Sequence, residues 1–157
     1  MPTDARSKYV AAPPRRARRA AGFTLIELMA AVAVVSILAA IALPAYMRYV
    51  VRSKTPVALD ALNAYSAQME QRYQDVGNYG SGACGVTVQQ TAANFTLACT
   101  FGSPTNAAGF TATAVGSGTL AGISYSIDDQ GVRKTLSHPY GVPPTSCWSI
   151  RGNTCDS

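Results

Sequence analysis

The residues of this 157-residue chain that could do chemistry are four cysteines, one histidine and one carboxylate inside an apolar run. The cysteines are Cys84, Cys99, Cys147 and Cys155, and none forms the C-x-x-C spacing of a zinc ribbon or a redox pair. Because their number is even, they fit two disulfides made in an oxidising compartment. Four cysteines allow three pairings. The pairing that joins sequence neighbours, Cys84–Cys99 with Cys147–Cys155, closes short loops.

The other polar motifs do not predict catalysis. His138 stands alone before Pro139, too far from the cysteines to indicate a metal site. The pair Asp128-Asp129 precedes Gln130-Gly131 and fits a turn better than an acid–base pair or a calcium loop. Gly116-Ser117-Gly118 lacks the basic residue and the helix of a phosphate loop. We therefore expect no enzyme activity, no bound metal and no cofactor.

The carboxylate is Glu27, which lies inside an apolar run from Phe23 to Leu43. A helix of this length spans about 30 Å, the thickness of the hydrocarbon core of a bilayer. Residues 1–22 carry six basic side chains against Asp4, a balance that equals the net charge of +5 of the whole chain. This excludes a protein that is basic throughout, and it places the N-terminus in the cytoplasm and the cysteines across the membrane.

Three other interpretations of the apolar run stay open. A secretory signal peptide could be cut after Ala42, although its apolar region should be shorter and free of carboxylates. A twin-arginine signal would use Arg15-Arg16 or Arg18-Arg19, without further support from the sequence. A plain membrane anchor explains the length and orientation but not Glu27, since a carboxylate in hydrocarbon is costly and usually functional.

The stretch Gly22-Phe23-Thr24-Leu25-Ile26-Glu27-Leu28 after a basic leader resembles the precursor of a type IV pilin. The resemblance covers Gly22 to about Tyr79 and includes the Cys147-Trp148…Cys155 ending. It implies that a prepilin peptidase cuts between Gly22 and Phe23, that Phe23 is then N-methylated, and that Glu27 is needed for assembly. The leader is longer than is usual for pilins that begin with Phe, which leaves the start codon open.

Elementary electrostatics gives Glu27 a role that fits this resemblance. Cleavage would expose an amine on Phe23, and a helical bundle could set that amine against the Glu27 carboxylate of a neighbouring subunit. A paired buried carboxylate recovers most of its desolvation cost, so the pair would fix the register between subunits.

The resemblance implies a structural subunit, a major or minor pilin of a type IV pilus that serves adhesion, twitching motility or DNA uptake. The expected partners are other pilin subunits, the prepilin peptidase, the inner-membrane assembly platform and membrane lipid. The precursor would cross the inner membrane once, with its C-terminus in the periplasm, before it reaches the cell surface in a pilus.

Two alternatives to a plain pilus subunit remain: a type II secretion pseudopilin, and a minor pilin that is a receptor for DNA or a host surface. DNA binding requires several phosphate contacts from basic side chains. Beyond Gly80 the chain offers Arg133, Lys134 and Arg151. They favour DNA binding only if they converge with Trp148.

The pattern of the chain predicts an α+β fold in four parts: a leader (1–22), a transmembrane and polymerisation helix (23–43), a helix continuing into the head (44–79), and a globular β head (80–157). Pro44 predicts a kink or an end of the helix, and Pro56 a second break or the start of a separate helix. An apolar stripe should pack on the sheet, and the helix should end near Gly77. The stripe consists of Leu59, Leu62, Ser66, Met69 and Tyr73.

The head should contain about four short antiparallel strands, because apolar and polar residues alternate in four segments bounded by turn residues. The segments are 95–101, 110–115, 123–128 and 132–136. Residues 80–93 are expected to form a loop tied by Cys84, and Asp129-Gln130-Gly131 a hairpin turn. Residues 137–157 should be irregular and closed by a disulfide, with Trp148 covering the edge of the sheet.

Overall fold

The structure, a computed structural model, describes residues 22–89 and 91–156. The chain divides into two compact units, residues 1–40 and residues 41–157. Apart from Gly22, the expected leader lies outside the described residues. Helix α1 (Leu25–Val76) begins in the first unit and ends in the second, which also contains a five-stranded sheet.

Helix α1 is continuous through both of its prolines, so the expectation that Pro44 or Pro56 ends or restarts the helix is wrong. A proline inside a helix removes one backbone hydrogen bond. Around Pro56 the loss is offset by packing, since Val51, Thr55 and Ala58 of the same turns are buried. The helix ends as predicted: Gly77 has a φ of +77°, and its N–H donates to the carbonyl of Tyr73 at 2.8 Å. This left-handed C-terminal cap suits glycine.

The sheet is a plain antiparallel meander in the order β1-β2-β3-β4-β5. The four predicted segments form β2 (Phe95–Phe101), β3 (Phe110–Gly116), β4 (Ser124–Asp128) and β5 (Arg133–Ser137). Contrary to expectation, residues 80–93 are not a loop throughout: near the end of this segment, Thr91–Ala92 forms the short edge strand β1, which pairs with β2. In the predicted turn between β4 and β5, the Asp128 carboxylate accepts the N–H groups of Gln130 and Val132.

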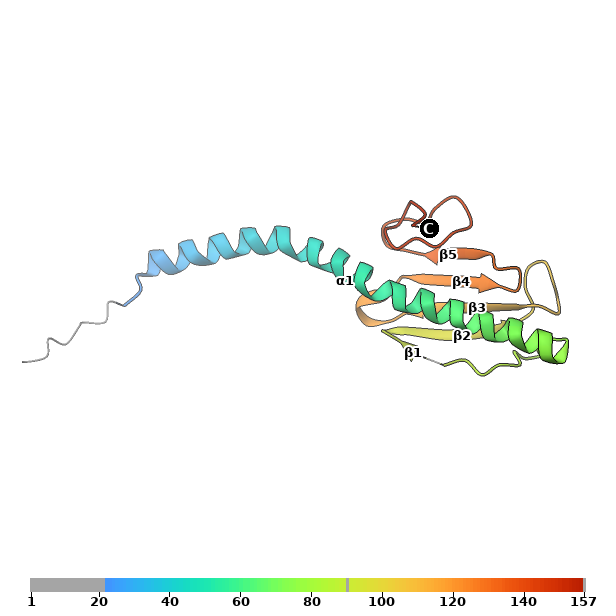
Figure 1. Ribbon diagram of the computed structural model, residues 1–157. Helices are drawn as coiled ribbons and strands as arrows, with labels where there is room; N and C mark the ends of the chain where they lie inside the picture. Colours follow the sequence, from blue (N-terminus) through green and yellow to red (C-terminus); the bar gives the residue numbers. More distant parts are fainter. Residues whose placement is uncertain (1–21, 90, 157) are drawn as a thin grey trace, which may run out of the picture. The chain divides into compact units, whose positions relative to one another are not determined.

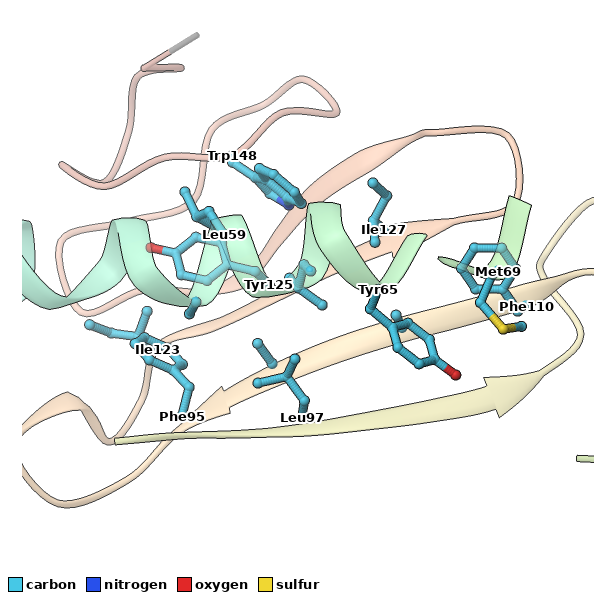
Figure 2. Close-up of a cluster of buried hydrophobic side chains, with 14 of the residues drawn as sticks. Leu59, Tyr65, Met69, Phe95, Leu97, Phe110, Ile123, Tyr125, Ile127 and Trp148 are labelled. Atoms are coloured by element: carbon cyan, nitrogen blue, oxygen red, sulfur yellow. The ribbon is translucent and has the colours of Figure 1, made fainter. Parts of the chain in front are cut away.

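The core of the second unit lies between the C-terminal part of α1 and one face of the sheet (Figure 1; Figure 2). The buried face of the helix follows 3–4 spacing, as predicted, but its members differ from the expected stripe. Tyr65 is buried in place of Ser66, and Tyr73 is exposed and stacks on Tyr79. The buried helix residues are Val51, Thr55, Ala58, Leu59, Leu62, Tyr65 and Met69.

The C-terminal segment is irregular, as predicted, and is fastened to the sheet by specific bonds. The Thr135 side chain of β5 donates to the carbonyl of Cys147 and accepts from the N–H of Ser149. The phenol of Tyr125 donates to the carbonyl of Ser149 at 2.7 Å. Disulfides join Cys84 to Cys99 and Cys147 to Cys155, the two pairs of sequence neighbours.

Candidate functional site

The segment that resembles a processing site lies at the start of α1. Gly22, Phe23 and Thr24 precede the helix, and the Phe23 side chain is 84% exposed. The Thr24 hydroxyl accepts the N–H of Glu27 at 3.3 Å. This is the N-cap contact of the T-x-x-E pattern in Thr24-Leu25-Ile26-Glu27, a signal that could have located the first residue of the helix from the sequence.

The apolar run that follows has no cover within its own unit. Its large apolar side chains from Phe23 to Leu38 are each more than half exposed. By length and composition α1 could cross a membrane. Exposed apolar surface of this extent indicates contact with lipid or with other protein. Glu27 is the acidic residue in the first turn of α1, where the helix dipole favours a negative charge.

A second feature is a group of arginines in the head. Arg48 and Arg52 stand four residues apart on α1 and therefore on one face of the helix. With Arg151 of the C-terminal segment they line a cavity of about 230 Å³. Its other lining residues are Val51, Tyr140 and Ile150. The Arg48 guanidinium carbon lies 5.3 Å from the centre of the Tyr140 ring.

Asp156 holds the Arg151 part of this cavity. One of its carboxylate oxygens lies 3.4 Å from Arg151 Nε, and the other accepts the N–H groups of Ile150 and Arg151. The Asp156 side chain is 18% exposed, whereas that of Arg151 is 67% exposed. The carboxylate therefore fixes the backbone of Arg151 and leaves the end of its guanidinium open to solvent.

The condition set for DNA binding, that Arg133, Lys134 and Arg151 converge with Trp148, is not met by all three. Arg133 lies over the indole at 4.8 Å from the ring centre and donates to Asn63 at 3.2 Å. Lys134 occupies the alternate position of β5, which faces the other side of the sheet. Trp148 is 4% exposed and donates to the carbonyl of Ser126, so it covers the sheet as predicted and cannot stack on a base.

The opposite end of the head carries a group of acidic side chains among basic ones. The end of α1 and the turn between β4 and β5 lie at the same end of the sheet (Figure 1). Glu70, Asp75, Asp128 and Asp129 belong to these segments, together with Arg72 and with Arg133 and Lys134, which follow the turn. Burial raises the pKa of the Tyr79 phenol, helped by its hydrogen bond to Glu70 and by the charge of Asp129.

The lone histidine is structural. His138 is buried, and its Nδ1 accepts the N–H of Tyr140 at 3.2 Å. Burial lowers the pKa of this imidazole, although the charge of Asp156 partly opposes the effect. Among the described residues, no group of three or more histidine, cysteine or acidic side chains could hold a metal ion.

The structure thus brings together residues that were considered separately in the sequence. The basic residues beyond Gly80 do not include Arg48 and Arg52, which the packing of α1 places beside Arg151. No local pattern signals this group, because its members are about 100 residues apart in the chain. Gly22, Phe23 and Glu27 lie together around the start of α1, as their spacing requires.

Comparison with known proteins adds two family matches. Residues 17–43 match the prokaryotic N-terminal methylation motif. Residues 44–124, more than half of the chain, match the family described as type IV minor pilin ComP, DNA uptake sequence receptor.

Several fimbrial proteins are similar to part of the chain. Fimbrial protein EcpC of Eikenella corrodens is 48% identical over 56 residues, which are 36% of this chain and 37% of that protein. The type IV major pilin protein PilA of Myxococcus xanthus is 48% identical over 63 residues, 36% of this chain and 29% of that protein. The chain therefore spans well under half the length of these relatives. A type IV pilin structure from Shewanella oneidensis aligns with a TM-score of 0.40 and 23% identity, over 59% of this chain and 90% of that one.

Proposed function

This chain belongs to the family of the type IV minor pilin ComP, and from that membership we propose that it is a structural subunit of a type IV pilus. The observation that carries the proposal is the exposed apolar run at the start of α1, joined to a unit that has its own core. Such a run needs lipid around it before assembly and other subunits around it afterwards. The role is structural rather than catalytic.

The precursor is proposed to be cut between Gly22 and Phe23 by a prepilin peptidase and then N-methylated on Phe23. The match to the N-terminal methylation motif supports this step. So does the geometry of the site, because α1 begins only at Leu25 and, among the described residues, no atom lies within 4 Å of a Cβ placed on Gly22. A peptidase can therefore approach the bond without first unwinding a helix.

Assembly is proposed to depend on Glu27, whose carboxylate would pair with the Phe23 amine of a neighbouring subunit. The cap contact between Thr24 and Glu27 supports this role because it fixes the first turn that carries the carboxylate. The inner-membrane assembly platform and the other pilin subunits are the partners that this route requires. The precursor would stand in the inner membrane with residues 44–157 in the periplasm, where the two disulfides can form.

The processing step is tested by N-terminal sequencing of the chain from membranes and from sheared filaments, in strains with and without the peptidase. We expect a chain that begins with methylated Phe23 only where the peptidase is present. Gly22→Ser should leave the precursor uncut in the membrane. A chain that begins at Leu43 would show cleavage after Ala42, as in a signal peptide, and would contradict the proposal.

A second candidate function is that of a DNA receptor, which the match to the family of a DNA uptake sequence receptor favours. Arg133, held over Trp148 by its contact with Asn63, is the ordered basic side chain of the sheet that could contact a phosphate. The test is binding of the full chain to duplex DNA at several salt concentrations. If Arg133 contacts a phosphate, Arg133→Gln should reduce the slope of log K against log salt by about 0.9. An unchanged slope would remove Arg133 from the interface.

A further inference from the structure

We propose that Arg48, Arg52 and Arg151 form a binding site for the phosphate group of an anionic membrane lipid. The site would be occupied while the chain stands in the membrane. The inference rests on the membrane-anchored precursor of the proposed function and adds a ligand to its head.

The charge of the residues that line the cavity favours an anion. Three guanidinium groups line it, and Asp156, bonded to Arg151, supplies one negative charge against them. Arg48 and Arg52 are like charges at i and i+4, an arrangement that destabilises an isolated helix. A phosphate bound between the two guanidinium groups would attract both and offset their mutual repulsion, since arginine binds phosphate in a bidentate manner.

The place of the cavity along α1 selects a lipid as the source of the phosphate. Arg48 and Arg52 follow Leu43, the last residue of the apolar run, by five and nine residues. These separations correspond to about 7.5 and 13.5 Å along a helix. The polar layer of a bilayer extends about 5–8 Å beyond the hydrocarbon on each side. Because side chains on a helix tilt toward its N-terminus, both arginines reach back toward that layer.

The remaining lining residues also suit the surface of a membrane. Tyr140 presents an aromatic body with a polar end, and such residues are enriched at the level of lipid headgroups. Val51 and Ile150 add apolar contacts beside the guanidinium groups. Extended nucleic acid needs a track of several phosphate contacts. The basic residues of β5 do not line the cavity: Arg133 lies over Trp148 and donates to Asn63, and Lys134 faces the other side of the sheet.

The test uses the full chain in a non-ionic detergent, titrated with phosphatidylglycerol and followed by native mass spectrometry to count bound lipid. We expect saturable binding. Arg48→Gln and Arg52→Gln should each weaken it about fivefold, and the double variant about 25-fold. Both side chains are exposed, so these variants should unfold at the same denaturant concentration as the wild type.

The matched control is Lys54→Gln, which removes one charge from the same helix. Lys54 does not line the cavity, and its ammonium group donates to Asn94 at 3.3 Å. Its replacement should leave lipid binding unchanged, whereas a loss equal to that of Arg52→Gln would show a diffuse charge effect and overturn the site. Arg48→Lys/Arg52→Lys keeps both charges but removes the paired N–H donors, so it should bind lipid more weakly than the wild type and more tightly than the double glutamine variant.

Competition distinguishes the sources of phosphate. Inorganic phosphate or duplex DNA, added at the concentration of the lipid, should leave it bound. Displacement by inorganic phosphate would identify a site for the free anion, and displacement by DNA a nucleic-acid site; either would overturn the lipid assignment. Binding in micelles needs neither cleavage nor filaments. If the chain binds lipid through the arginines but forms no pili, only the proposed function is contradicted. If it forms pili but its lipid binding does not depend on the arginines, only this inference is contradicted.

Discussion

Two titratable side chains, Glu27 and His138, lie in surroundings that disfavour a charge. Glu27 is a carboxylate in an apolar run, and its backbone N–H is capped by Thr24. His138 is an imidazole removed from water, and its Nδ1 is engaged with the N–H of Tyr140. They lie in different units of the chain, so each can be tested separately.

Replacing Glu27 with alanine should prevent filament assembly without preventing insertion. Removal of a carboxylate from the edge of the hydrocarbon should ease insertion by about 2–3 kcal/mol. The cut after Gly22 should persist, because the leader is unchanged. The measurement compares the membrane content of the chain with the yield of sheared filaments.

Glu27→Asp is the control for this experiment, since it keeps the charge and shortens its reach by one methylene. A partial defect would show that geometry matters as well as charge. Normal filaments from Glu27→Ala would contradict the pairing of Glu27 with the Phe23 amine.

The stability of the head should fall as the pH drops below about 6.5, the ordinary pKa of histidine. Burial lowers the pKa of His138 in the folded state, so the unfolded chain binds the proton more tightly. Stability therefore rises with pH over this interval and is lost on acidification. Urea denaturation at pH 7.5 and 5.5 measures the difference, which His138→Asn should reduce. The same pH dependence in the variant would assign the effect to other groups.

The helix and strands show how far the sequence could predict the fold. The four long strands and the end of α1 at Gly77 were predictable, because alternation and a glycine cap are local signals. The two-residue β1 was not, since it depends on pairing with β2. Neither Pro44 nor Pro56 ends the helix. Around Pro56 the lost hydrogen bond is offset by buried neighbours, whereas Leu43 and Tyr46 beside Pro44 are exposed.

The candidate sites divide in the same way. Gly22, Phe23 and Glu27 form a continuous motif, so the sequence could single them out, and their roles stay predictions. The contact of Arg48 with Tyr140 and the place of Arg151 beside them depend on tertiary packing. Pairwise spacing carries no information about such a group.

The two disulfides should have different effects on the C-terminal segment. In the chain-entropy estimate, loops of these lengths each contribute about 2–3 kcal/mol to the free energy of unfolding. Cys147→Ser/Cys155→Ser should also loosen the loop that carries Trp148, the one tryptophan of the chain. Cys84→Ser/Cys99→Ser should leave the indole covered.

Tryptophan emission and its quenching by acrylamide distinguish the two double variants in the folded state. We expect a red shift and stronger quenching only in the variant that lacks Cys147 and Cys155. Equal shifts in both variants would mean that the cover of Trp148 does not depend on its own loop.

At the scale of the whole molecule, the residues that form the hydrophobic core and the exposed apolar run belong to different segments of the chain. Every buried apolar side chain of the described residues lies at Val51 or beyond, within the unit of residues 41–157. The run from Phe23 to Leu38 contributes none. The two parts should therefore be separable by truncation.

A chain that begins at Ala45 should fold in water without detergent, as a monomer with a cooperative unfolding transition. Size-exclusion chromatography with light scattering measures its mass, and Trp148 fluorescence in urea follows its unfolding. Leu62→Ala in this chain should lower the free energy of unfolding by about 2–5 kcal/mol, because Leu62 is fully buried. Aggregation or a gradual transition would show that the head needs the apolar run.

The exposed apolar run also limits where a subunit can wait before use. A chain that carries it would have no stable dissolved state, so on the proposed route it would pass from lipid directly into contact with other subunits. The supply for growth is then a two-dimensional pool, measured in copies per area of membrane rather than in moles per litre. Growth would slow when the membrane expands and the number of copies stays fixed, even though the amount of protein in the cell has not changed.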